Sequence, residues 1–180
     1  LRIIAGTESH SGERIDGHNV EDSFYAQHQL EALDLQNTVL EELKNCGSQM
    51  TEQELRNLLG CFLFGGDEVD KKIKVLSGGE KARVALAKTI VSRANFLLLD
   101  EPFSGIDPIQ VMELQRIILD LKNAGIGILI TDHSVEKTLA VTDRAYIIND
   151  GKIFRSGTPD ELGHDPEARR VYLGENFSLG

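Results

Sequence analysis

The stretch Phe96-Leu-Leu-Leu-Asp-Glu-Pro102 decides the fold of this chain. Its short continuous run of apolar residues is typical of a strand that is buried on both faces of a parallel sheet. Asp100 and Glu101 follow the run directly, so both carboxylates are expected at the carboxyl end of a central strand. Open α/β sheets bind their ligands at this end. The stretch therefore predicts an α/β fold with an acidic site at one edge of the sheet.

A glycine-bearing turn stands upstream of this strand, in Leu76-Ser-Gly-Gly-Glu-Lys-Ala-Arg83. Ser77 is a favoured N-cap residue and apolar residues recur at helical spacing over 81–93, so we expect a helix to begin at this turn. Gly78 and Gly79 carry no side chain, which lets their backbone N–H groups approach an anion closely. The pattern predicts a helix N-terminus suited to a phosphate group.

A second turn and a second strand follow the acidic pair. Ser104-Gly-Ile-Asp107 is a polar turn, and Asp107 followed by proline is a favoured helix start, because proline is accepted at the first helical position. The helix is expected to run to about Lys122. Ile126–Thr131 is another continuous apolar run, and it predicts a second strand buried on both faces.

A short strand over 20–26 and a helical insert over 30–70 are expected before the glycine-bearing turn. Within the insert, 38–44 is amphipathic, and Thr51-Glu-Gln-Glu54 is a capping box that opens a second helix. Beyond the second buried strand the sequence predicts a helix over 134–141, a hairpin over 145–154, and short helices after Thr158 and Asp165.

Composition narrows the classes of function. The formal net charge of −10 argues against a general nucleic-acid-binding surface, because phosphate contact needs clustered Lys and Arg. No apolar run approaches the ~18 residues of a membrane-spanning helix, and the N-terminus has no signal-peptide pattern. Cys46 and Cys61 lack metal-ligand spacing, and Cys61 is expected to be a buried thiol. We therefore expect a cytoplasmic protein that reaches any membrane through a partner.

The motifs, taken as an ordered set, resemble those of the ATP-binding cassette (ABC) ATPases. The corresponding segments, in chain order, are a Q-loop at Tyr25–Gln27, the family signature at Leu76–Glu80, the Walker B strand at Phe96–Glu101, the D-loop at Ser104–Asp107 and the switch-histidine strand at Ile128–His133. The resemblance implies a P-loop NTPase-like fold, with a mainly parallel sheet, flanking helices and a helical subdomain. It also implies that 1–180 is a single partial ABC ATPase domain. Within it, the helical subdomain spans about 28–75, and the signature, Walker B strand, D-loop and switch histidine lie in 76–143. A C-terminal hairpin and helices form 144–180.

One family motif is missing from the sequence. The phosphate-binding loop GxxxxGK[ST], called Walker A, should stand before Leu1, and none of the 17 glycines leads into a Lys-Ser or Lys-Thr pair. The resemblance therefore implies an N-terminally truncated cassette. Such a chain is expected to be a weak or inactive ATP hydrolase by itself.

The resemblance also implies ATP and Mg²⁺ as cofactors and assigns roles to individual residues. Asp100 would hold Mg²⁺, Glu101 would polarise the attacking water, His133 would contact the γ-phosphate, and Gln27 would bind Mg²⁺ and position the water. Contacts to a nucleotide held on an opposing cassette would come from Ser77, Gly78, Gly79, Glu80, Ser104, Gly105 and Asp107.

Simpler interpretations of these residues stay open. The carboxylate pair could cap the next helix, and His133 could be a core histidine with satisfied hydrogen bonds. The residues of the two turns could be present only because they form turns. Asp107 followed by proline would be explained in this way, as a helix start.

The two parts of the chain resemble different branches of the family. Residues 1–102 resemble ABC-F proteins, which are soluble ATPases acting on the ribosome, whereas 103–180 resemble the ATPase of bacterial lipopolysaccharide export. We therefore hypothesise that the chain is a mosaic, or chimera, in which segments from the two branches are joined within Leu97–Pro102.

The implied partners are a second ABC domain and either membrane transporter subunits or the ribosome, contacted through the helical subdomain. We favour an ATPase that drives a transporter, with lipopolysaccharide export as the system. The alternatives are a ribosome-associated ATPase and a non-catalytic interaction module.

Overall fold

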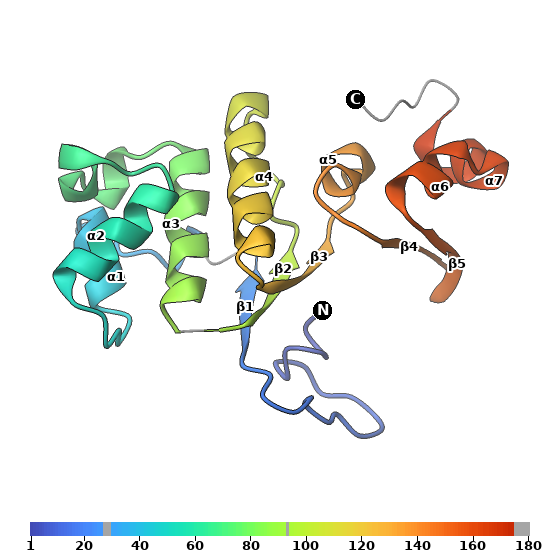
Figure 1. The fold of residues 1–180 in the computed structure, drawn as a ribbon, viewed down its shortest axis with the longest axis horizontal. Coiled ribbons are helices and arrows are strands. Elements are labelled where there is room, and N and C mark those ends of the chain that lie inside the picture. The colour runs from blue at the N-terminus through green and yellow to red at the C-terminus, as the bar shows by residue number, and fades with distance from the viewer. Residues whose placement is uncertain (27–29, 93, 175–180) are drawn as a thin grey trace. The chain divides into compact units, whose positions relative to one another are not determined.

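The computed structural model describes residues 1–26, 30–92 and 94–174, and the chain forms two compact units, Leu1–Thr131 and Asp132–Gly180. Figure 1 labels the elements along the chain. The first unit contains β1 (Asp22–Ala26), α1 (Val39–Lys44), α2 (Glu52–Cys61), the 3₁₀ helices Gly66–Asp70 and Ile73–Val75, α3 (Gly78–Val91), β2 (Phe96–Asp100), α4 (Pro108–Asn123) and β3 (Gly127–Thr131).

A parallel three-stranded sheet in the order β1-β2-β3 forms the centre of the first unit. Leu97, Leu98 and Leu99 of the middle strand are fully buried, so the apolar run of β2 is covered on both faces. Because side chains alternate along a strand, Leu98 points to one face and its two neighbours to the other. The prediction of a central buried strand and of an α/β fold is confirmed.

The prediction that the next strand is buried on both faces is wrong. In β3 the three apolar residues of 128–130 are only half-buried, and the terminal Gly127 and Thr131 are exposed. The reason is position in the sheet, because β3 pairs with β2 on one side and has no partner strand on the other within the described residues. An apolar run does not distinguish a central strand from an edge strand.

The helix α3 has more buried residues than any other helix described in the first unit. Ser77 caps it, since its hydroxyl accepts the Glu80 N–H at 3.2 Å, while the Glu80 carboxylate accepts the Ser77 N–H at 2.7 Å. Nine of its fourteen residues are buried, and it contacts β1, α1 and α4. Figure 1 shows α3 standing between the helical insert and α4. This helix therefore connects the insert to the sheet.

The helical insert begins each of its two helices with a capping box. Thr38 and Glu41 exchange hydrogen bonds at the start of α1, and Thr51 and Glu54 do so at the start of α2, where the sequence predicts a capping box. The prediction of a buried thiol at Cys61 is wrong, because Cys61 is exposed at the end of α2. The buried side of that helix is set by Leu55 and Leu59, and Cys61 falls outside it.

The second unit contains α5 (Val135–Leu139), the hairpin of β4 (Ala145–Asn149) and β5 (Lys152–Gly157), α6 (Pro159–His164), α7 (Pro166–Ala168) and a π-helical turn, Arg169–Leu173. The hairpin strands pair antiparallel, and Thr158 and Glu161 form a capping box at the start of α6. These elements agree with the predicted helix, hairpin and short helices. None of the helices described in either unit is long and apolar enough to cross a membrane.

A partly buried ion pair, with the carboxylate buried and the lysine 28% exposed, joins the insert to α3. Glu42 of α1 is only 4% exposed, and its Oε1 lies 2.5 Å from the Lys88 Nζ, while its Oε2 accepts a hydrogen bond from the Asn37 side chain at 2.8 Å. A buried carboxylate is tolerated only when it is paired in this way.

Replacing Lys88 with methionine should lower the free energy of unfolding by about 2–3 kcal/mol, because it leaves the Glu42 carboxylate buried without its cation. Urea unfolding monitored by circular dichroism measures the change. The double variant Glu42→Met/Lys88→Met is the matched control and should recover most of the loss, since no buried charge remains. A single Lys88→Met variant as stable as the native chain would contradict this account.

Tyr25 of β1 is 2% exposed, and burial raises its pKa from the ordinary 10.0 to about 12. The folded state therefore retains the phenolic proton at pH values where the unfolded state has lost it. The contribution to stability is complete below pH 10 and is lost as the pH rises to about 12, by about 2–3 kcal/mol. Urea unfolding at several pH values from 9 to 12 measures this loss. It should be smaller in Tyr25→Phe and unchanged in Tyr146→Phe, because Tyr146 is 54% exposed.

Candidate functional site

The carboxyl ends of the three parallel strands lie in register. Ala26 of β1 pairs with Asp100 of β2, and Asp100 pairs with Thr131 of β3. The Thr131 hydroxyl donates to the Asp100 Oδ1 at 2.6 Å. This bond fixes the Asp100 carboxylate at the predicted edge of the sheet, and Thr131 had no predicted role there. This role could have been predicted from the sequence, because Thr131 is the last residue of the next predicted strand and has a hydroxyl that can donate to a carboxylate.

Glu101 occupies a backbone conformation that is uncommon for its residue type. Its φ is +51°, and its N–H donates to the Thr131 carbonyl at 2.7 Å while its carbonyl accepts the Ser104 N–H at 3.2 Å. A non-glycine residue in the left-handed region costs free energy and is concentrated at functional sites. The alternative in which the acidic pair caps the next helix is not observed, since Asp107 caps α4.

The turn at 77–80 presents its backbone at the start of α3. Ser77 and Gly78 are exposed, whereas Gly79 is buried against Gln110 of α4. The Ser77 hydroxyl accepts the Glu80 N–H through a lone pair and keeps its own proton available for donation. Glu80 itself is a capping residue, with its carboxylate on the Ser77 N–H. Direct nucleotide contact by Glu80 stays a prediction.

The second turn, at 104–107, lies beside the first. A Cβ built on Gly78 would lie 3.9 Å from the carbonyl oxygen of Gly105, and Gly105 has a φ of +72°. The Asp107 Oδ1 accepts the N–H groups of Ile109 and Gln110 at 3.1 Å each, which caps α4. The two turns, far apart in the sequence, therefore form one continuous surface on the first unit.

The described geometry does not test the position of two predicted catalytic residues relative to this edge. His133 belongs to the second unit, where its side chain is 67% exposed and its Nδ1 lies 3.6 Å from the Asp132 Oδ1. It is therefore not a buried core histidine, and its approach to Glu101 stays a prediction. Gln27 lies outside the described residues.

The acidic pair is compatible with a magnesium ion that is held mainly by other ligands. Within residues 1–26, 30–92 and 94–174, no three His, Cys, Asp or Glu side chains gather as a metal cluster. Asp100 uses Oδ1 for Thr131, and its Oδ2 has no partner in the same ranges. Mg²⁺ usually takes one or two carboxylates together with waters and substrate phosphates. One carboxylate oxygen at a strand end fits such a site.

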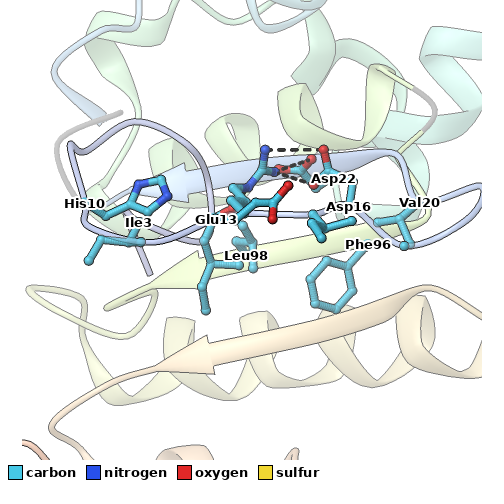
Figure 2. A pocket seen from close by; sticks show the side chains of 12 residues that line it. Ile3, His10, Glu13, Asp16, Val20, Asp22, Phe96 and Leu98 are labelled. Atoms are coloured by element: carbon cyan, nitrogen blue, oxygen red, sulfur yellow. Dashed lines mark hydrogen bonds and ion pairs between the residues drawn. The ribbon is translucent and has the colours of Figure 1, made fainter.

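A hollow of about 460 Å³ lies elsewhere on the first unit, and Figure 2 shows its lining. Phe96 and Asp22, the first residues of β2 and β1, contribute to it, so it opens near the amino ends of the strands. Three of its charged side chains are paired with one another, with the Arg14 guanidinium 2.8 Å from Asp16 and 3.4 Å from Asp22. This hollow is distinct from the predicted site at the carboxyl ends.

Comparison with known proteins agrees with the fold and the order of these motifs. A family model described as ABC transporter matches residues 1–104, which include β1, the turn at 77–80 and the acidic pair. This match covers more than half of the chain. The chain therefore belongs to the ABC transporter family.

Curated relatives are named for lipopolysaccharide export. The chain is similar to the lipopolysaccharide export system ATP-binding protein LptB of Haemophilus influenzae, with 52% identity over 141 residues, 78% of this chain and 58% of that protein. The protein of the same name from Escherichia coli K12 is 52% identical over 104 residues, 58% of this chain and 43% of that protein. The chain thus spans about half the length of these relatives.

Solved structures give the same fold. An ATP-binding cassette of an ABC transporter in its ADP conformation matches with a TM-score of 0.67 at 23% identity, over 87% of this chain and 68% of that one. The protein cbiO1 of Clostridium perfringens, part of the ABC transporter complex cbiONQ, matches with a TM-score of 0.67 at 26% identity. The match covers 84% of this chain and 61% of cbiO1. The predicted P-loop NTPase-like ABC fold is confirmed.

The relatives also bear on the predicted mosaic. An alignment of 141 residues is longer than the stretch 103–180, so the similarity to the Haemophilus influenzae protein includes part of 1–102. Similarity to the export ATPases is therefore not confined to the second part of the chain. A join within Leu97–Pro102 stays a prediction, and the two LptB proteins give no support to a ribosomal partner.

Gly79 and Gly78 should respond differently to substitution by alanine. A Cβ on Gly79 would lie 2.4 Å from the Gln110 Cβ, so Gly79→Ala should lower the free energy of unfolding by about 1–3 kcal/mol. Gly78→Ala is the matched control, because its nearest neighbour would lie at 3.9 Å, and its effect should stay within about 0.5 kcal/mol. Urea unfolding of both variants measures the difference. Equal stability would contradict the packing described for the two turns.

Proposed function

We propose that this chain is part of an ATP-hydrolysing nucleotide-binding domain that drives a membrane transporter. The observation that carries the proposal is the register of the strand ends, which puts Asp100 beside Thr131 with Glu101 next in the chain. ATP hydrolysis requires a divalent cation, a positioned water and stabilisation of the charge that develops on the transferred phosphoryl group.

In this proposal the two carboxylates have separate roles. Asp100 would hold Mg²⁺, while its Oδ1 accepts a hydrogen bond from the Thr131 hydroxyl that orients the carboxylate. Glu101 polarises the attacking water, and His133 and Gln27 assist at the γ-phosphate. Mg²⁺, when bound, neutralises charge on the phosphate oxygens. The uncommon backbone of Glu101 supports a functional role, because such strain is concentrated at functional sites.

The two turns act on a nucleotide held by an opposing cassette. The Ser77 hydroxyl proton, the N–H groups of Gly78 and Gly79, and the positive end of α3 are suited to a phosphate. Ser104, Gly105 and Asp107 line the adjoining surface, with Glu80 supporting the first turn. Each chain therefore provides a phosphate-facing surface for its partner cassette, which makes a dimer the active form.

Lipopolysaccharide export is the transport system that we infer. It is supported by relatives of that name at 52% identity. In this setting the protein works in the cytoplasm at the inner membrane, against the membrane subunits of the transporter. The sequence contains no GxxxxGK[ST] motif, so activity by this chain alone is expected to be weak.

A non-catalytic interaction module is the second candidate. It is supported by exposed apolar side chains on the helical insert, with Leu35 47% and Val75 65% exposed. The two are neighbours, because the Leu35 carbonyl accepts the Lys74 N–H at 3.2 Å. A transporter subunit could dock on this surface whether or not the chain hydrolyses ATP.

The experiment that separates the candidates is a titration of the purified chain with Mg²⁺-ATP, followed by calorimetry, sedimentation and phosphate release. We expect saturable binding, ATP-dependent dimerisation and slow turnover. Glu101→Gln should lower turnover roughly 100-fold or more, because it removes the general base, and should leave ATP binding nearly unchanged. Glu21→Gln is the matched control, since Glu21 is exposed and directly precedes β1.

Two outcomes would overturn the ATPase proposal. One is full turnover by Glu101→Gln. The other is negligible turnover by a correctly folded chain that has been extended to include a Walker A segment, and in that case the interaction module is the candidate that remains.

A further inference from the structure

Arg83 lies where three parts of the first unit meet. It belongs to α3, its Nη1 donates to the Gln110 side chain at 2.6 Å, and the same nitrogen pairs with the Glu113 carboxylate. Its guanidinium carbon lies 5.3 Å from the ring centre of Phe64, which follows α2 in the helical insert. One side chain therefore contacts the insert, α3 and α4.

Gln110 extends this contact to both turns of the candidate site. Its side chain packs on Gly79, so closely that a Cβ there would lie 2.4 Å from its Oε1. Its backbone N–H donates to the Asp107 carboxylate at 3.1 Å. The guanidinium of Arg83 thus holds the residue that touches the turn at 77–80 on one side and the turn at 104–107 on the other.

The position is unusual for a charged side chain. The Arg83 side chain is 7% exposed, and its Nε has no hydrogen-bond partner among the described residues. Burial of a guanidinium with an unsatisfied N–H is unfavourable, and apolar residues of similar volume often stabilise a core as well or better. The charge is therefore not explained by filling of the core.

We propose that Arg83 is a positioning residue that holds the two turns in one fixed arrangement and links them to the helical insert. This inference rests on the proposed function, in which the two turns form the phosphate-facing surface. Through Gln110, Arg83 fixes the distance between the Ser77–Gly79 backbone and Asp107. Through Phe64, it connects the insert, where a partner would dock, to that surface.

Hydrogen exchange of backbone amides tests the arrangement directly in the native chain. Arg83→Met fills the volume but removes both hydrogen bonds, so protection should fall roughly tenfold or more at the first turns of α3 and α4 together. Arg83→Lys should restore most of it, because a single nitrogen makes both bonds in the native chain. The amides of β2 should keep their protection in both variants.

Two further variants guard against a simple folding defect. Glu113→Gln keeps the size of the side chain and removes its charge, and it should weaken protection at the same two turns. Arg116→Met is the matched control, because Arg116 is exposed on α4, and it should change nothing at either turn. Unchanged exchange in Arg83→Met, or equal loss of protection over the whole first unit, would overturn the proposal.

ATP turnover provides a second readout that separates this inference from the proposed function. Where the native chain hydrolyses ATP, Arg83→Met should lower kcat roughly tenfold with little change in KM, since the affected surface acts in the transition state. A kcat equal to that of the native chain would overturn the positioning role in catalysis. If the native chain has no turnover, hydrogen exchange alone decides whether Arg83 holds the two turns, and the proposed function is tested separately on a chain extended to include a Walker A segment.

Discussion

The burial of β2 is the constraint on which the first unit depends. Leu97, Leu98 and Leu99 can be removed from water only if both faces of the strand are covered and both of its edges are paired. Parallel pairing with β1 and β3 satisfies the edges and aligns the carboxyl ends of all three strands. The position of Asp100 and Glu101 follows from this alignment. The acidic site is therefore a consequence of how an apolar strand is buried.

The helix α3 extends the same constraint to the rest of the unit. Its first turn carries the exposed backbone of the candidate site, and its remaining length is buried among the insert, the sheet and α4. Lys88 ties it to Glu42 of the insert, and Arg83 ties it to Glu113 of α4. A helix held by ion pairs on two sides cannot shift without disturbing both neighbours. The turn at 77–80 is in this way connected to surfaces that lie far from it in sequence.

Local signals in the sequence were sufficient for the elements and for most of their boundaries. Capping boxes at Thr51 and Thr158, and the cap at Asp107, each mark a helix start that the structure confirms. Burial was less predictable, since it depends on neighbours distant in the chain. The half-exposed β3 and the exposed Cys61 are failures of this kind, because an apolar run or an apolar context does not specify sheet order or helix orientation.

In the candidate site, too, local features were predictable from the sequence and contacts between distant elements were not. The acidic pair and the glycine-bearing turns could be identified from residue types and spacing, because the chemistry demands them. Their supports, Thr131 and Gln110, could not, because each acts through a contact between elements. Ser77 and Glu80 lie between these cases, since their mutual capping is local and also serves the site.

The backbone conformation of Glu101 has a consequence for the history of such chains. Glycine and asparagine accept a φ of +51° more readily than glutamate does, so selection for stability alone would favour them at this position. A glutamate persists there only while its carboxylate has a use. In descendants that have lost that use, drift is expected to replace it with glycine or asparagine, and the residue at this position becomes a marker of whether a lineage still depends on the acidic site.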